Sequence, residues 1–76
     1  MNAAPHGPPV RVPVAVRNGI LAVRDSSLTN MFDINKVCEL ARTLGFHEAA
    51  IWIRSNIAEY RNGIWNGWVA DENAQA

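Results

Sequence analysis

Leu28-Thr29-Asn30-Met31-Phe32-Asp33 is the stretch that organises this chain, because it places two large apolar residues among polar turn formers. Short polar side chains such as those of threonine and asparagine favour turns by bonding to nearby backbone groups. Asp33 suits the N-cap of a following helix, where its carboxylate accepts from a free backbone N–H and faces the positive end of the helix dipole. We expect Met31 and Phe32 to form an apolar plug between two helices.

Upstream of this turn, the spacing predicts a helix from Pro13 to Ser26. Proline is tolerated in the first helical turn, and Val16, Ile20 and Val23 then recur at intervals of four and three residues. Gly19 lies on the same face, where the missing side chain would let a second helix approach closely. The residues before Pro13 alternate between apolar and polar, which fits either a short edge strand or the approach to the helix; the proline favours the approach.

Downstream, apolar residues at helical spacing predict a second helix from Ile34 to Leu44. Gly45 suits a left-handed stop, and Phe46 can fold back on the last turn. A third helix is expected from His47 to about Trp65. The pair Asn62-Gly63 is also a two-residue hairpin signal, so a hairpin there stays open as the alternative to helix.

These patterns predict an all-α domain of three helices with flexible tails. The expected divisions are a proline-rich leader at residues 1–12, a helical domain at 13–68 and a tail at 69–76. The expected core comprises Val16, Ile20, Val23, Phe32, Val37, Cys38, Ala41, Leu44, Ile53, Ile57, Tyr60 and Ile64.

Composition narrows the possible functions. Seven basic residues balance seven acidic ones, so no overall field attracts nucleic acid or a membrane. A single cysteine cannot form an internal disulfide, which fits the cytoplasm, and no apolar run is long enough for a membrane span. Because 76 residues supply only a small core, a homodimer is plausible.

The residues offer little catalytic chemistry. His47 and Glu48 are adjacent, so on a helix their side chains point apart, and no third group completes a catalytic set. Cys38, His6 and His47 lack the short spacing of structural zinc sites. We therefore expect no enzyme activity, no metal site and no cofactor.

Three tryptophans exceed what three short helices are expected to bury. Trp52 lies about 120° around the helix from the predicted apolar stripe, so we expect it to be exposed. Aromatic and arginine side chains dominate the binding energy of protein interfaces. The predicted partner-binding residues are Trp52, Trp65, Trp68, Arg54 and Arg61.

The alternative function is that of a small regulator that binds DNA through a helix-turn-helix, with the later helix in the major groove. Arg17 and Arg24 lie seven residues apart on one side of the first helix and would contact phosphates, together with Arg54 and Arg61. Charge does not favour this alternative, because Glu48 and Glu59 lie on the outer face of the third helix.

The chain also resembles a family of small phage and prophage proteins of unknown role. The resemblance covers about residues 16–67 and is carried by Ile20, Val23-Arg24, Ser26, Thr29-Asn30-Met31-Phe32-Asp33, Val37, Ala41, Gly45-Phe46 and Tyr60. It implies a helical domain encoded by a mobile element, and small phage proteins often act by binding. The function it suggests is inhibition or modulation of a host protein or ribonucleoprotein complex, as anti-CRISPR proteins do in the host cytoplasm.

Overall fold

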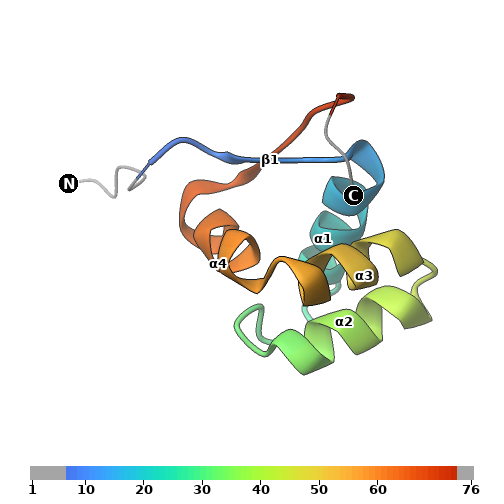
Figure 1. The fold of residues 1–76 in the computed structure, drawn as a ribbon. Helices are drawn as coiled ribbons and strands as arrows, with labels where there is room; N and C mark the ends of the chain where they lie inside the picture. The colour runs from blue at the N-terminus through green and yellow to red at the C-terminus, as the bar shows by residue number, and fades with distance from the viewer. Residues whose placement is uncertain (1–6, 74–76) are drawn as a thin grey trace.

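The computed structural model describes residues 7–73, which form four α-helices and one pair of short strands (Figure 1). The expected leader and tail fall partly on residues 1–6 and 74–76, which lie outside the described residues. In chain order the elements are β1 (Val10–Val12), α1 (Val14–Ser26), α2 (Ile34–Thr43), α3 (His47–Ser55), α4 (Ile57–Asn66) and β2 (Trp68–Ala70).

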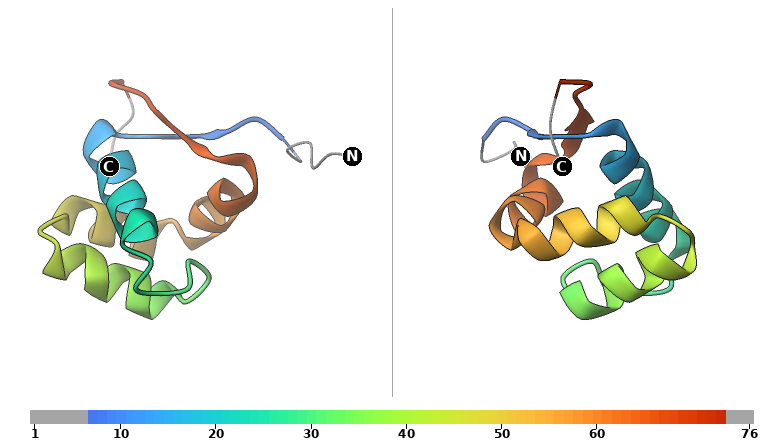
Figure 2. Two further views of the ribbon diagram at one scale, coloured as in Figure 1. Left: turned by 180° about the vertical axis from the view of Figure 1, so that it is seen from behind. Right: turned by 45° about the vertical axis from the view of Figure 1, so that its right-hand side comes forward.

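The helix α3 is the centre of the helical layer, because it packs against α1, α2 and α4 (Figure 2). Burial on several sides explains why Ala49, Ala50, Trp52 and Ile53 are all buried within its nine residues. A helix with one solvated face would bury a narrower stripe. The expectation that Trp52 is exposed is therefore wrong: only 5% of its surface remains accessible.

The predicted close approach at Gly19 of α1 is confirmed. A Cβ atom placed on Gly19 would lie 2.8 Å from the Cβ of Phe46 and would also collide with Ala49. The helix begins at Val14 with Pro13 at its N-cap. It ends at Ser26, and the C-cap Ser27 has a left-handed φ of 58°. The two helices α1 and α3 thus cross where α1 carries no side chain.

The predicted start of α2 at Ile34 is confirmed, and the helix ends at Thr43, one residue before the predicted Leu44. The Asp33 carboxylate caps the helix by accepting from the Lys36 N–H at 3.3 Å. Gly45 takes the left-handed conformation with φ 92°, and the Phe46 N–H then bonds to the Ala41 carbonyl at 2.7 Å. Phe46 packs against the core as expected for the apolar contact of such a helix end.

The prediction of a single long third helix is wrong, because this segment is interrupted at Asn56 and forms the two helices α3 and α4. Asn56 has φ −137° and ψ 53°, and its side-chain amide donates to the Trp52 carbonyl at 3.0 Å. Asparagine competes for backbone partners in this way, which ends one helix without proline or glycine. The chain then remains helical through Asn62-Gly63, so helix rather than hairpin is confirmed there.

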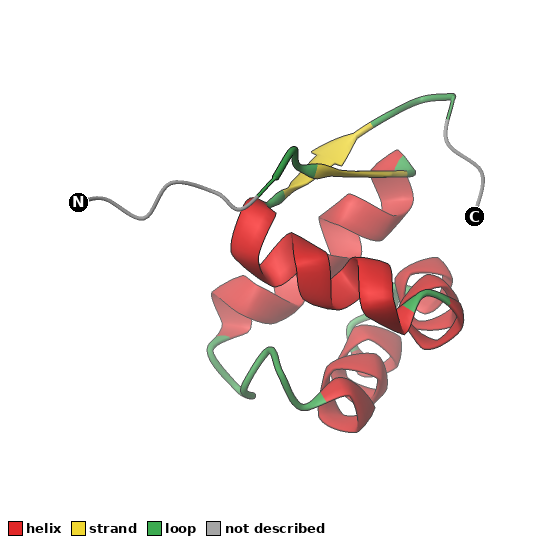
Figure 3. Ribbon diagram, turned by 60° about the vertical axis from the view of Figure 1, so that its left-hand side comes forward, coloured by secondary structure: helices red, strands yellow, loops and turns green. Residues whose placement is uncertain are grey.

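A parallel strand pair makes the fold not strictly all-α. The register joins Val10 to Trp68 and Val12 to Ala70, and the Val10 N–H bonds to the Gly67 carbonyl at 2.9 Å. Figure 3 shows the strands together at one end of the helices, next to α1 and α4. Parallel strands need a long crossover, which here consists of all four helices.

The strand pair and the helix break change the expected core. Phe32, Leu44 and Ile57, which were expected inside, are exposed, and Ile64 is half-buried against the core. The other eight predicted core residues are buried. The core gains the following residues from the strands and from α3: Val12, Ala50, Trp52 and Trp68.

Candidate partner-binding site

The loop between α1 and α2 is held in one shape by its own hydrogen bonds. The Asn30 side chain accepts from the Phe32 N–H at 2.8 Å, and the Asn30 carbonyl accepts from the Asp33 N–H at 2.9 Å. From outside the loop, the Tyr60 hydroxyl of α4 donates to the Met31 carbonyl at 2.6 Å. The predicted turn is confirmed, and its centre is docked on α4.

This docking brings Phe32 of the loop against Trp65 of α4. Their ring centroids lie 6.0 Å apart, with the ring planes inclined by 58°. Such a tilted arrangement is favourable between aromatic rings. Even so, Phe32 is 53% exposed and Trp65 is 63% exposed. We refer to Phe32 and Trp65 as the aromatic pair.

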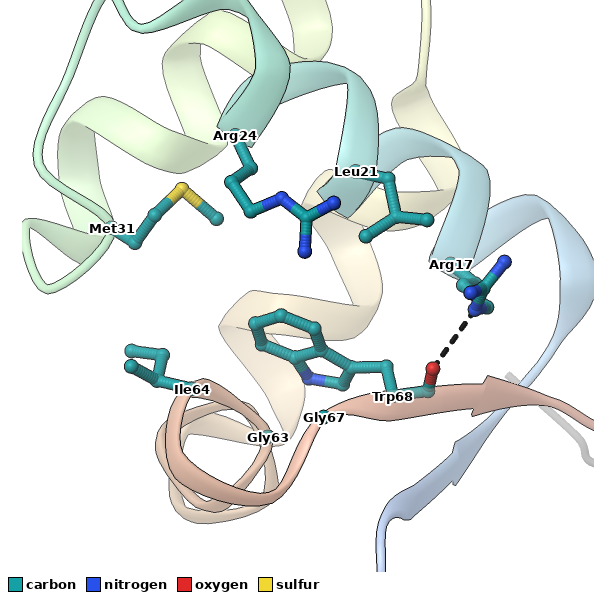
Figure 4. Close-up of a pocket in the computed structure, with 8 residues that line it drawn as sticks. All are labelled: Arg17, Leu21, Arg24, Met31, Gly63, Ile64, Gly67 and Trp68. Carbon is teal, nitrogen blue, oxygen red and sulfur yellow. Dashed lines mark hydrogen bonds between the residues drawn. The ribbon is translucent and has the colours of Figure 1, made fainter. Parts of the chain in front are cut away.

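A cavity of about 290 Å³ lies between α1 and the end of α4 (Figure 4). Met31 and Ile64, the chain neighbours of Phe32 and Trp65, form part of its wall. The remaining lining residues are Arg17, Leu21, Arg24, Gly63, Gly67 and Trp68. We refer to this cavity as the arginine cavity.

The two arginines of the cavity come from α1. The Arg17 Nε–H donates to the Trp68 carbonyl at 2.8 Å, which ties α1 to β2 (Figure 4). The Arg24 side chain extends over the cavity toward Trp68, and its Nε lies 3.5 Å from a carboxylate oxygen of Asp25. The structure therefore brings together the two arginines that were predicted to contact phosphates.

Trp68 forms one side of the cavity and is only 8% exposed. Its indole stacks on the Tyr60 ring with a centroid distance of 5.7 Å and packs directly on Gly63, where a Cβ atom would collide with it. The indole N–H has no hydrogen-bond partner. Trp68 is thus a structural residue of this site and not an exposed anchor.

The other predicted binding residues lie elsewhere. Arg54 of α3 donates to the Asn35 side chain of α2 at 3.0 Å, and Arg61 is exposed on α4. Neither arginine lines the arginine cavity. Of the three tryptophans predicted to bind a partner, Trp65 alone is exposed.

Sequence reasoning placed Phe32 in the core and so missed it as a site residue. The available signal was the position of Phe32 between Met31 and Asp33, because a loop that turns this tightly directs adjacent side chains apart. A second, smaller cavity of about 160 Å³ lies on another side of the same loop and is lined by Leu28, Thr29, Lys36, Glu39, Leu40 and Thr43.

The described residues offer neither a metal site nor a membrane-spanning helix. Within residues 7–73, no three histidine, cysteine or acidic side chains are grouped closely enough to hold a metal ion. Cys38 is buried, with its sulfur 3.7 Å from the Ala50 carbonyl oxygen. None of the helices in this part of the chain has the length and apolar character needed to cross a membrane.

Comparison with known proteins identifies a family. A family model described as a domain of unknown function (DUF5049) matches residues 14–67. The chain belongs to the DUF5049 family. No curated protein and no solved structure gives a significant match.

The DUF5049 match covers all four helices and stops before β2. The aromatic pair, both cavity arginines and Tyr60 therefore lie inside the DUF5049 domain. The strand pair and Trp68 lie outside the matched residues, so one side of the arginine cavity is contributed by a segment that the family model does not include.

Proposed function

We propose that this DUF5049 domain is a binding module that inhibits or modulates a host complex by attaching to a protein of that complex. The observation that carries the proposal is the aromatic pair: two large rings, each more than half exposed, held against each other by a hydrogen-bonded loop. Exposed aromatic side chains on a rigid support are typical anchors of protein interfaces.

The rigidity of the loop supports this function. Binding through a mobile loop loses free energy because side chains and backbone become ordered on association. Here the Tyr60 hydroxyl and the Asn30 side chain both hold the peptide group between Met31 and Phe32. The Asn30 carbonyl accepts from the Asp33 N–H, which restrains the backbone after Phe32. A partner would thus meet a preformed surface.

The sequence resemblance to small phage and prophage proteins supports a host protein or ribonucleoprotein complex as the target. The most specific version of this proposal is an anti-defence role like that of anti-CRISPR proteins. Cells with active CRISPR immunity that express the protein should then allow phage to form plaques, and the variant Trp65→Ala should restore immunity.

The direct test is affinity capture from bacterial lysate, with and without nuclease, followed by mass spectrometry. The natural chain should capture a host protein even when the lysate has been treated with nuclease. The double variant Phe32→Ala/Trp65→Ala should fail to capture that protein. The matched control is Ile51→Ala, because Ile51 of α3 is as exposed as Trp65, at 63%, but lies outside the aromatic pair. Equal capture by all three proteins, or capture that nuclease abolishes, would refute the proposal.

Self-association through the aromatic pair is the main competing outcome. Sedimentation velocity over a range of concentrations detects self-association, because a homodimer would dissociate on dilution. The double variant Phe32→Ala/Trp65→Ala should then be monomeric at concentrations where the natural chain is a dimer. A dimer that depends on Phe32 and Trp65 would mean that the aromatic pair is occupied by a second copy.

A further inference from the structure

The arginine cavity carries positive charge without compensation inside it. Two of its lining residues are arginines, and none of its lining residues, all of which lie in the described part of the chain, is acidic. Arg17 and Arg24 are seven residues apart, so they lie two turns apart on one side of α1, a rise of about 10 Å. Both arginines line the same cavity.

The existing partners of these arginines leave donors available. Arg17 uses its Nε–H for the Trp68 carbonyl, which positions the guanidinium while its terminal N–H groups can serve a ligand. Arg24 is paired with Asp25 at 3.5 Å, and both of these side chains are more than half exposed. Exposed pairs of this kind contribute little, so Asp25 does not hold the Arg24 guanidinium strongly.

The shape and lining of the cavity select the kind of anion. A volume of about 290 Å³ is at the lower limit for small-molecule sites and suits a single side chain. Leu21, Met31, Ile64 and Trp68 supply apolar walls that suit the methylene groups of an amino acid. Met31 and Ile64 directly precede Phe32 and Trp65 in the chain, so the arginine cavity and the aromatic pair lie in the same part of the molecule and one partner can contact both.

We infer that the arginine cavity binds the carboxylate of a glutamate or aspartate side chain of the partner, next to an apolar residue that packs on the aromatic pair. This inference rests on the proposed function, because the side chain in the cavity belongs to the partner protein. The recognised chemistry is a carboxylate held by two guanidinium groups, a geometry that arginine matches well.

The test uses N-acetylglutamate amide as the probe and N-acetylglutamine amide as its neutral match, at constant ionic strength. Titration is followed by NMR through the assigned indole N–H of Trp68. The glutamate compound should shift this signal to saturation, and the glutamine compound should not. Equal shifts, or no shift with the glutamate compound up to tens of millimolar, would overturn the inference.

Variants link the binding to the cavity. Arg24→Gln should lower the affinity for the glutamate compound by about tenfold or more, the change expected when one charge-assisted hydrogen bond is lost. Arg24→Lys should retain part of the affinity. The control Arg42→Gln removes an exposed arginine of α2 that does not line the cavity, and it should bind like the natural chain. An equal loss in Arg42→Gln would show general charge attraction and overturn the site.

Inorganic phosphate forms a further arm of the titration. Tighter binding of phosphate than of the glutamate compound would overturn the carboxylate assignment and favour a phosphorylated ligand. The titration needs no partner, so it can fail while partner capture through Phe32 and Trp65 succeeds. Conversely, saturable glutamate binding without any captured protein would refute the proposed function and leave the cavity assignment standing.

Discussion

The Tyr60 hydroxyl donates a 2.6 Å hydrogen bond to the backbone carbonyl of Met31, and this bond joins α4 to the loop that presents Phe32. The two residues are 29 positions apart in the chain. The bond thus joins the two segments that carry the aromatic pair, because Phe32 follows Met31 in the loop and Trp65 lies five residues beyond Tyr60 on α4. Several expected outcomes depend on this contact and on the packing around it.

Replacing Tyr60 by phenylalanine removes the hydroxyl and leaves the Met31 carbonyl without this donor. We expect the variant Tyr60→Phe to lower the free energy of unfolding by about 1–2 kcal/mol, the usual cost of such a loss. Urea denaturation followed by circular dichroism measures this change. A variant as stable as the natural chain would mean that the bond contributes nothing to the fold.

Burial raises the pKa of the Tyr60 hydroxyl well above its ordinary value of 10.0, and interaction with Cys38 adds to the shift. The folded protein therefore keeps a proton that the unfolded chain loses above about pH 10. The contribution of the Tyr60 hydroxyl to the free energy of unfolding is therefore fully present below pH 10 and decreases as the pH rises above that value. Tyr60 is the only tyrosine, so the ultraviolet absorbance of tyrosinate reports it without ambiguity.

The absorbance titration should show a higher midpoint for the folded protein than for the same protein in concentrated urea. The loss of stability above pH 10 should also be smaller in Tyr60→Phe than in the natural chain. Identical midpoints in the two states would contradict the buried position of the hydroxyl.

The tryptophans should differ sharply in their effect on stability. Trp52 is part of the buried core, so Trp52→Ala should cost about 3–5 kcal/mol, the range for large aromatic residues in a core. Trp65→Ala should cost only about 0.5–1.5 kcal/mol, the range for loss of an aromatic pair contact. Thermal melts of the two variants make the comparison, and a stable Trp52→Ala variant would contradict the central position of α3.

Gly63 of α4 tests the packing of Trp68. A Cβ atom at Gly63 collides with the indole, so Gly63→Ala should destabilise the protein by about 1–3 kcal/mol although alanine favours helix. Asn62→Ala is the matched control on the exposed neighbouring position and should be neutral or slightly stabilising. If Gly63→Ala behaved like the control, the indole would not rest on α4.

The ends of α1 and α2 could be predicted because their causes are local. Asp33, Gly45 and Ser27 act within a few residues of themselves, through a cap bond or a left-handed backbone conformation. The break at Asn56 is also local, but the asparagine signal is weak beside the continuous apolar spacing from Ile53 to Ile64. Helical periodicity alone does not show that the axis has changed direction.

The aromatic pair and the arginine cavity were predicted only in fragments. Trp65, Arg17 and Arg24 were identified as candidates from their type and position, but nothing in the sequence placed the two arginines beside Trp68. Phe32 was expected inside the core because it was interpreted, with Met31, as an apolar plug between two helices. Its exposure follows from the Tyr60 contact, which fixes the loop with Met31 inward.

By itself, the sequence determined the helical character of the domain, the polar turn at Asn30, the caps of α2 and the close crossing at Gly19, since each of these follows from interactions between near neighbours or from a missing side chain. Only the tertiary structure decided that Val10 to Val12 pairs with residues almost 60 positions away, that Trp52 and Trp68 are buried, and that Phe32 meets Trp65. These outcomes depend on how four helices pack around α3, and the burial that results is a property of the whole assembly of helices.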